Sequence, residues 1–146
     1  MADVFTRAER SQIMAAVRSS GNKGTELKLI SILRAGGITG WRRKQTLFGK
    51  PDFVFRRQRL AVFVDGCFWH GCPRHLRMPA GNARYWRNKI SRNRARDLAT
   101  NRRLRASGWR VLRIWEHALR CPNLVAKRLE LALKKPRAKR KNQARL

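Results

Sequence analysis

The spacing of apolar residues along the chain predicts a series of helices. Apolar side chains recur every three or four residues in several segments, which places them on one helical face. Thr6 and Glu9 have the spacing of a capping box, Thr25 is a second N-cap candidate, and Gly36 and Gly108 are placed to end helices. We therefore predict helices over about residues 6–18, 25–35, 85–106 and 124–133.

A different pattern separates the second and third of these helices. Phe53–Phe55 and Leu60–Val64 are runs of β-branched and aromatic residues, and the polar segment Arg56–Arg59 joins them. This arrangement predicts a β-hairpin, and Trp109–Trp115 is predicted to form another strand. The order of helices and strands indicates an α/β fold, with a mixed β-sheet flanked by helices.

The length of 146 residues suits one compact domain with a hydrophobic core and is too short for two. We expect this domain to span residues 1–133. Residues 134–146 contain Pro136 and almost no apolar side chain, so we expect a disordered basic tail.

The charge of the chain indicates a polyanionic partner. Lys and Arg number 36 against 8 Asp and Glu, which gives a formal net charge of +28. Nucleic acid is the expected partner. A ribosomal or membrane-surface role would also explain the charge, but such proteins need no cluster of Cys, His and carboxylates. No run of 18 apolar residues occurs, so we expect a cytosolic protein without membrane insertion.

Two thiols and two imidazoles lie within the nine residues from Cys67 to His75. Zinc prefers four such ligands in a tetrahedral arrangement. Cys67, Cys72 and His75 would supply three, leaving His70 free, and either His117 or Cys121 would supply the fourth. Singly, such residues are often ordinary buried or surface side chains. Their density favours a structural zinc site.

Acidic residues are scarce, so each one on an apolar element is informative. Asp52 precedes the predicted hairpin and Asp65 follows it. Hydrolysis of a phosphodiester requires a divalent cation, and Mg²⁺ prefers carboxylate oxygens. We expect Asp52 to bind Mg²⁺, His70 to act as general base and Glu26 to orient it or a water. The alternative is that both aspartates are turn residues, and the lysine usual in such sites is missing.

The chain resembles the very short patch repair (Vsr) family of DNA mismatch endonucleases. The resemblance rests on the string from Phe63 to His70, with Pro51-Asp52 upstream and the segment Gly108–Glu116 downstream, and it runs from about Val4 to Ala132. It implies a restriction-endonuclease-like fold in which Asp52 binds Mg²⁺, His70 activates the water and Glu26 supports the site. The zinc ligands it implies are Cys67, Cys72, His75 and His117, with Cys121 in reserve.

The same resemblance implies how DNA is bound. Residues 1–24 would form a DNA-contacting helix and loop that brings Met14 into one groove. Phe68, Trp69 and Trp86 would form the aromatic wedge that enters beside the mismatch, where stacking offsets the cost of opening the step. Lys89 and Asn93, one turn apart on a helix, would read the mismatched pair. The alternatives are a solvated basic helix face and, for Trp86, a core position.

The chain departs from the best-known members at two positions, with Asp65 in place of a histidine and Val64 in place of a threonine. Asp65 could then bind a second Mg²⁺.

The function predicted is Mg²⁺-dependent nicking of one strand of double-stranded DNA at a T·G mismatch, leaving 5′-phosphate and 3′-hydroxyl ends. We expect a monomer acting in the bacterial cytosol, at the nucleoid, with mismatch-repair proteins as partners. One alternative is a homing or restriction-type nuclease that cuts both strands of matched DNA. Another is a non-catalytic, zinc-stabilised DNA-binding module.

Overall fold

The computed structural model of the protein describes residues 23–74 and 79–135. This part of the chain is a mixed α/β structure with a four-stranded sheet. Its elements follow in chain order as α2 (Lys23–Ala35), β1 (Trp41–Arg42), β2 (Phe53–Phe55), β3 (Leu60–Asp65), α3 (Ala83–Ala106), β4 (Arg110–Trp115), the 3₁₀-helix η1 (Glu116–Arg120) and α4 (Pro122–Lys134). The predicted helix at residues 6–18 and the predicted tail after residue 135 lie outside the described residues.

The sheet has the strand order β1-β2-β3-β4 and mixes antiparallel with parallel pairing. The hairpin predicted from sequence is confirmed: β2 and β3 pair antiparallel, with Phe53 opposite Val62. β3 and β4 pair in parallel, with Asp65 opposite Trp115. Parallel neighbours need a long crossover connection, and the segment that contains α3 provides it. The two parallel strands therefore end at the same edge of the sheet.

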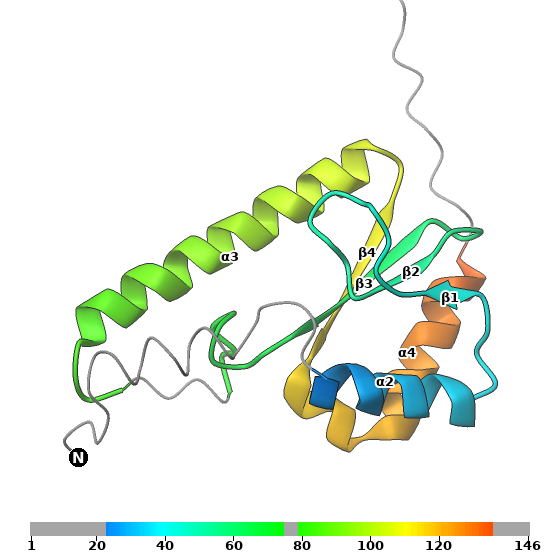
Figure 1. Ribbon diagram of the computed structural model, residues 1–146, viewed down its shortest axis with the longest axis horizontal. Coiled ribbons are helices and arrows are strands. Elements are labelled where there is room, and N and C mark those ends of the chain that lie inside the picture. The colour runs from blue at the N-terminus through cyan, green and yellow to red at the C-terminus, as the bar shows by residue number, and fades with distance from the viewer. Residues whose placement is uncertain (1–22, 75–78, 136–146) are drawn as a thin grey trace, which may run out of the picture.

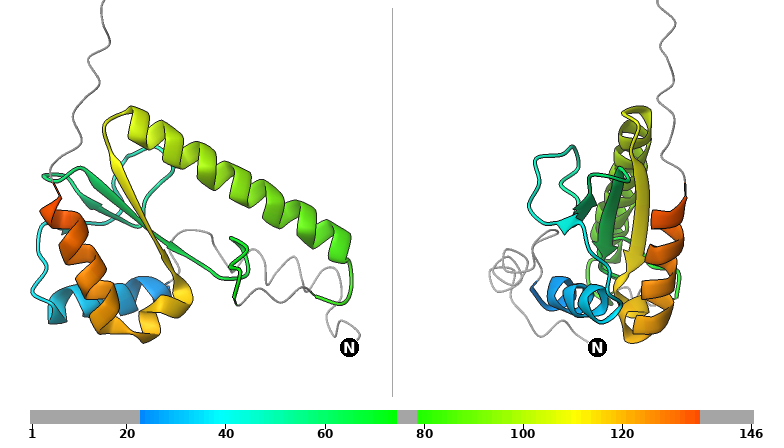
Figure 2. Two further views of the ribbon diagram at one scale, coloured as in Figure 1. Left: turned by 180° about the vertical axis from the view of Figure 1, so that it is seen from behind. Right: turned by 90° about the vertical axis from the view of Figure 1, so that its right-hand side faces the viewer.

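Helices cover both faces of the sheet (Figures 1 and 2). All six residues of β3 are buried, as expected for a strand covered on both sides. Its alternate side chains enter two cores: Val62 and Val64 pack with Leu29 of α2 and Leu129 of α4. On the other face, Ala61 and Phe63 pack with Leu104 of α3. The result is a three-layer arrangement with β3 at its centre.

Helix α3 is the longest element and extends well past the sheet at its N-terminal end (Figure 1). It ends where predicted, since Gly108 has a φ of +86°, a left-handed conformation that suits glycine after a helix. The loop after β3 lies against this helix. Gly71 has a φ of +65°, and a Cβ at that position would come within 2.8 Å of Ile90 Cγ2. Both features make a side chain at position 71 unfavourable.

Three details of the secondary structure differ from the sequence-based expectation. Thr25 is not an N-cap, because α2 already includes Lys23. Apolar periodicity locates the buried face of a helix better than its first turn. The two-residue strand β1 and the helix η1 were not predicted, since neither is long enough to show a period. Among the described residues, no helix is long and apolar enough to cross a membrane.

The contact between α4 and the main core should carry much of the stability. Leu129 has no exposed surface, whereas Leu131 on the same helix is 58% exposed. We predict that Leu129→Ala lowers the free energy of unfolding by about 2–5 kcal/mol, because it leaves a cavity in a packed core. Leu131→Ala should change it by less than about 0.5 kcal/mol. Urea unfolding followed by circular dichroism measures both, and equal effects would contradict the packing described.

Candidate active site and Cys/His cluster

The edge of the sheet where β3 ends collects acidic side chains. Asp52 directly precedes β2, and its carboxylate accepts a hydrogen bond from the backbone N–H of Val64 on β3, at 2.8 Å. Asp65 is the last residue of β3 and is 5% exposed. Both aspartates line a cavity of about 180 Å³ that also contains His70. The structure thus brings together three of the residues predicted from sequence.

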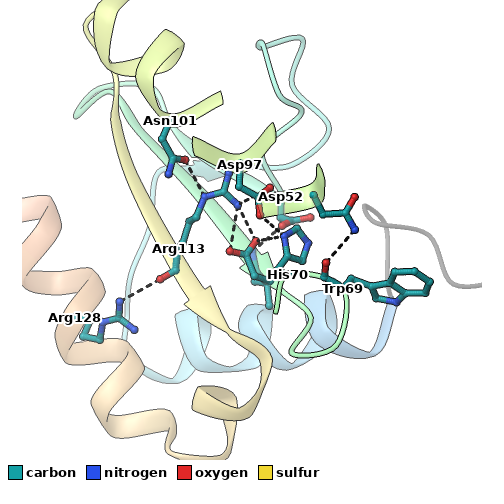
Figure 3. A network of polar contacts seen from close by, with 10 residues as sticks. Asp52, Trp69, His70, Asp97, Asn101, Arg113 and Arg128 are labelled. Carbon is teal, nitrogen blue, oxygen red and sulfur yellow. Dashed lines mark hydrogen bonds and ion pairs between the residues drawn. The ribbon is translucent and has the colours of Figure 1, made fainter. Parts of the chain in front are cut away.

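His70 points its Nδ1 toward Asp97 (Figure 3), and Asp65 lies near the same nitrogen. Its Nδ1 is 2.5 Å from Oδ2 of Asp97, a residue in the middle of α3, and 3.8 Å from Oδ1 of Asp65. Burial alone would lower the pKa of His70, but the hydrogen bond to Asp97 and the charge of Asp65 more than reverse this effect, and the pKa is raised. With Nδ1 engaged by a carboxylate, Nε2 is the nitrogen left for a reacting molecule.

Arg113 on β4 links the two carboxylates that face His70 (Figure 3). One of its terminal nitrogens is 2.9 Å and 3.1 Å from the two oxygens of Asp65 and 3.5 Å from Asp97 Oδ1. Its Nε donates to Asn101 Oδ1 at 2.8 Å, and its guanidinium carbon lies 4.2 Å from the centre of the Phe63 ring. Burial raises the pKa of Asp65, and His70 and Arg113 act against that increase. Arg113 therefore compensates a buried charge.

Asp52 and Glu26 form the other side of the site. Burial raises the pKa of Asp52 to about 6, and the charges of Glu26 and Asp65 act in the same direction. Glu26 is itself 7% exposed and forms an ion pair with Arg43. Glu26 and Asp52 line a second cavity together. A carboxylate with this pKa is one whose negative charge would be stabilised by a nearby cation.

A second group of side chains combines sulfur and nitrogen atoms. The Sγ atoms of Cys67 and Cys72 lie 3.3 Å and 3.6 Å from Nδ1 of His117, and all three ligand atoms are within 4.8 Å of one another. Cys67 and Cys72 come from the turn after β3, and His117 comes from η1 after β4. Cys121 is exposed and is not part of this group. Of the two alternatives left open by the sequence, the structure places His117 with the cysteines.

The pKa of the Cys67 thiol is raised in this cluster. Burial raises the pKa of Cys67, and the neighbouring Cys72 raises it further. A bound cation would reverse both effects, because a thiol that coordinates a metal is deprotonated. Two thiols and one imidazole are donors that suit zinc.

The predicted DNA wedge is a cluster of aromatic rings at the N-terminal half of α3. The centre of the Phe68 ring is 5.2 Å from that of Trp69 and 5.5 Å from that of Trp86. Phe68 and Trp69 are half-buried, whereas Trp86 is only 5% exposed. Trp86 is therefore the buried member of the cluster, and its ring packs edge-on against the other two. Its Nε1 has no hydrogen-bond partner in the part of the chain that is described.

Lys89 and Asn93 both contact the loop that carries this wedge. Asn93 Nδ2 donates to the backbone carbonyl of Trp69 at 2.9 Å, and Lys89 Nζ lies 5.4 Å from the centre of the Trp69 ring. The two side chains thus share a face of α3 with the wedge. Met14 and His75, the remaining predicted site residues, lie outside the described residues.

Sequence reasoning missed Asp97 and Arg113. Asp97 is the one acidic residue of α3, whose other charged residues are all basic, so the scarcity of acids could have identified it. Arg113 is a charged residue within the otherwise apolar segment Val111–Trp115. Neither signal indicates the partner, because both contacts join segments that are far apart in sequence.

Sequence comparison with known proteins identifies a family of DNA endonucleases. Residues 2–75 match the family described as DNA mismatch endonuclease Vsr. The Type II nicking enzyme V.NaeI of Lentzea aerocolonigenes is 48% identical over 117 residues, which span 75% of this chain and 69% of the relative. The DNA mismatch endonuclease Vsr of Escherichia coli (strain K12) is 40% identical over 121 residues, spanning 82% of this chain and 77% of the relative.

A third relative, the Type II nicking enzyme V.NmeDIP of Neisseria meningitidis serogroup C, is 40% identical over 79% of this chain and 78% of its own length. The cluster of acids around His70 and the similarity over most of the chain point to the same conclusion. The protein belongs to the Vsr family of DNA mismatch endonucleases and is a DNA endonuclease.

Proposed function

We propose that the protein nicks one strand of duplex DNA at a T·G mismatch, using Mg²⁺ and leaving 5′-phosphate and 3′-hydroxyl ends. The observation that carries the proposal is the placement of Asp52 and the His70–Asp97 pair around one cavity. That cavity lies in a chain whose relatives include nicking enzymes and a mismatch endonuclease. The choice of the T·G mismatch rests on the family resemblance.

Asp52 is the proposed Mg²⁺ ligand, with Glu26 beside it. The donor set fits a hard cation, because it consists of one half-buried and one buried carboxylate in an otherwise basic protein. When bound, the cation polarises a phosphoryl oxygen and offsets the charge that develops on the leaving oxygen. Asp52 itself is held by the backbone N–H of Val64, which fixes the direction of its free oxygen.

His70 is the proposed general base. Its Nδ1–H donates to Asp97, so that Nε2 accepts the proton of the attacking water. Asp97 positions the ring and stabilises the imidazolium that forms, and it does not itself contact the substrate. This assignment gives the middle of α3 a role in the chemistry as well as in DNA binding.

Asp65 is proposed to act with Arg113 rather than to hold a second Mg²⁺. Arg113 contacts both of its carboxylate oxygens, so a second cation would have to displace a guanidinium. In this arrangement Asp65 also stabilises the charge of His70, because its Oδ1 lies 3.8 Å from the same Nδ1 that Asp97 contacts. We therefore propose a single catalytic metal.

Structural zinc is proposed for the Cys67, Cys72 and His117 cluster. These residues supply three of the four ligands that a closed tetrahedral site requires. His75, outside the described residues, is the proposed fourth. Zinc at this position would tie the turn after β3 to the segment after β4.

The wedge is proposed to consist of Phe68 and Trp69, which are partly exposed, with Trp86 as their support. Inserting their rings beside the mismatch would replace lost base stacking. Lys89 and Asn93 would face the same step of the duplex. Met14 is proposed to enter from the other groove, carried by the DNA-contacting segment 1–24.

The mixed sheet with its acid-bearing hairpin supports a restriction-endonuclease-like fold, which we propose for a domain spanning residues 1–133. Lys134, with which the predicted tail begins, is the last residue of α4. We further propose a disordered basic tail for the residues after 135. The protein would act as a monomer in the bacterial cytosol, at the nucleoid, together with mismatch-repair proteins.

Cleavage of defined duplexes tests the proposed function directly. Labelled duplexes that differ only in carrying a T·G or a T·A pair are incubated with and without Mg²⁺, and each strand is followed on a denaturing gel. We expect one nick, in the T·G duplex, only with Mg²⁺. Equal cutting of both strands in the matched duplex would instead establish a restriction or homing type of nuclease. Absence of cutting with every divalent metal would refute the proposal.

The roles of His70 and Asp97 predict a non-additive pair of substitutions. His70→Ala should lower kcat about 10²–10⁴-fold, the usual contribution of a general base. Asp97→Asn should lower kcat less, and the double variant should be no slower than His70→Ala alone, because Asp97 acts through the imidazole. Single-turnover cleavage of the T·G duplex measures all three.

A matched control for this pair is Arg128→Ala. Arg128 donates to the backbone carbonyl of Arg113 at 3.2 Å and belongs to the same polar network, but it does not contact His70. Its kcat should stay within about threefold of the parent value, as expected for an exposed residue away from the reacting groups. Additive losses from His70→Ala and Asp97→Asn would contradict the positioning role of Asp97.

The zinc proposal predicts that His117, and not Cys121, is a zinc ligand. The purified protein should contain one zinc per chain by elemental analysis, and His117→Ala should lose it together with thermal stability, because metal binding contributes to folding. Cys121→Ser should keep both. Retention of zinc by His117→Ala and its loss from Cys121→Ser would assign the ligand to Cys121.

A further inference from the structure

A cavity of about 410 Å³ adjoins the proposed active site. It lies between α2 and the loop that connects β1 to β2, and Glu26, Arg43, Lys44, Lys50 and Asp52 are among the residues that line it. Lys50 and Asp52 also line the smaller cavity that contains His70. The two cavities therefore share a wall, and whatever occupies the larger one lies next to the site of cleavage.

Both lysines that line this cavity have an unfavourable backbone conformation. Lys44 has a φ of +52° and Lys50 a φ of +49°, in the left-handed region that glycine adopts at no cost. Both side chains are exposed, so neither contributes to core packing. Strain of this kind is concentrated at functional sites. This backbone conformation therefore motivates a search for a functional contact of the two ammonium groups.

The excess of cationic side chains in the cavity favours binding of an anion. Glu26 is already paired with Arg43, and within residues 23–74 and 79–135 neither Lys44 nor Lys50 forms an ion pair. Three cations face two carboxylates, so the lining carries a net positive charge even when both acids are ionised. A divalent cation at Asp52, as proposed above, makes the lining more positive still, and phosphate charge would offset part of this excess.

The loop that carries these lysines is anchored on α3. Gly49 approaches Thr100 so closely that a Cβ at this position would lie 2.3 Å from Thr100 Cγ2. The guanidinium of Arg103 lies 3.9 Å from the centre of the Phe48 ring. Lys50 is thereby held in a fixed place relative to the helix that carries Asp97. Such rigidity favours binding of a ligand at a defined distance from His70.

We propose that this cavity binds a backbone phosphate of DNA next to the scissile phosphate, with Lys50 as its principal cationic contact and Lys44 as its second. Phosphates follow one another every 3.4 Å or so of helix rise along a strand. A strand with its scissile phosphate at Asp52 therefore presents a neighbouring phosphate within reach of the adjoining cavity. The inference rests on the proposed DNA cleavage and adds the register in which the cut strand lies.

Neutralising single phosphates tests this contact. Duplexes with one methylphosphonate at a time in the cut strand are bound by the parent protein and by Lys50→Gly, with Ca²⁺ replacing Mg²⁺ to prevent turnover. One replacement, beside the scissile position, should weaken binding by the parent about threefold to tenfold. The same replacement should have almost no effect on Lys50→Gly, because the charge that it faced is gone. A methylphosphonate at any other position should change binding by the parent and by Lys50→Gly to the same extent.

Further variants separate charge from backbone effects. Lys50→Gly should fold with unchanged or higher thermal stability, since it relieves the left-handed strain. It should also reduce the slope of the logarithm of the binding constant against the logarithm of the salt concentration by about 1, the value expected for one lost phosphate contact. Lys50→Arg should behave like the parent. Lys134→Ala, which removes one charge from the end of α4 outside both cavities, should show no coupling to any single phosphate.

Coupling at no phosphate, or equal coupling with Lys134→Ala, would overturn the inference. These results are distinct from failure of the proposed function, which is measured by nicking of the unmodified duplex with the parent protein. A protein that nicks DNA without phosphate coupling at Lys50 would retain the proposed function and lose this phosphate site.

Discussion

The burial of β3 on both faces and along both edges is the constraint from which the rest of the structure follows. A strand whose six residues are all buried must hydrogen-bond to a neighbour on each side and be covered by helices above and below. The antiparallel neighbour β2 brings Asp52 to the edge where β3 ends. The parallel neighbour β4 ends at the same edge. The acids of the hairpin and the segment after β4 therefore meet in space.

This edge of the sheet concentrates negative charge in a protein that is otherwise strongly basic. Four of the eight acidic residues, namely Glu26, Asp52, Asp65 and Asp97, lie around the proposed site. Burial of carboxylates without compensation is unfavourable, and Arg43 and Arg113 are the internal cations that pair with them. The arrangement leaves Asp52 with a raised pKa and without an arginine partner in the described network. A cation near such a half-buried carboxylate would stabilise its charged form.

A single turn after β3 carries several of the proposed functions. Cys67 and Cys72 lie on either side of Phe68, Trp69 and His70, and the backbone N–H of Cys72 donates to the carbonyl of Cys67 at 2.8 Å, which closes the turn. The turn packs against α3 at Gly71 and through Asn93. A metal at the two cysteines would therefore fix the aromatic rings and the imidazole together. The residues of the proposed wedge and the proposed general base are thus neighbours in one short turn.

Much of the architecture could be predicted from local sequence. The alternation of apolar segments predicted three helices and three strands of the described fold, together with the hairpin and the end of α3 near Gly108. The types of side chain at Cys67, Cys72, Asp52 and His70 indicated metal and acid–base chemistry. The basic composition indicated a polyanionic partner, and the family resemblance indicated which one.

Tertiary structure alone decided which residues meet. The partnership of His70 with Asp97 depends on how α3 crosses the sheet, and that of Asp65 with Arg113 depends on the parallel register of β3 and β4. The grouping of His117, rather than Cys121, with the cysteines depends on the turn of η1. These contacts join segments 27 to 50 residues apart in the chain. A local pattern of residues sets the conformation of each segment, but the distance between two segments is set by how their apolar faces pack.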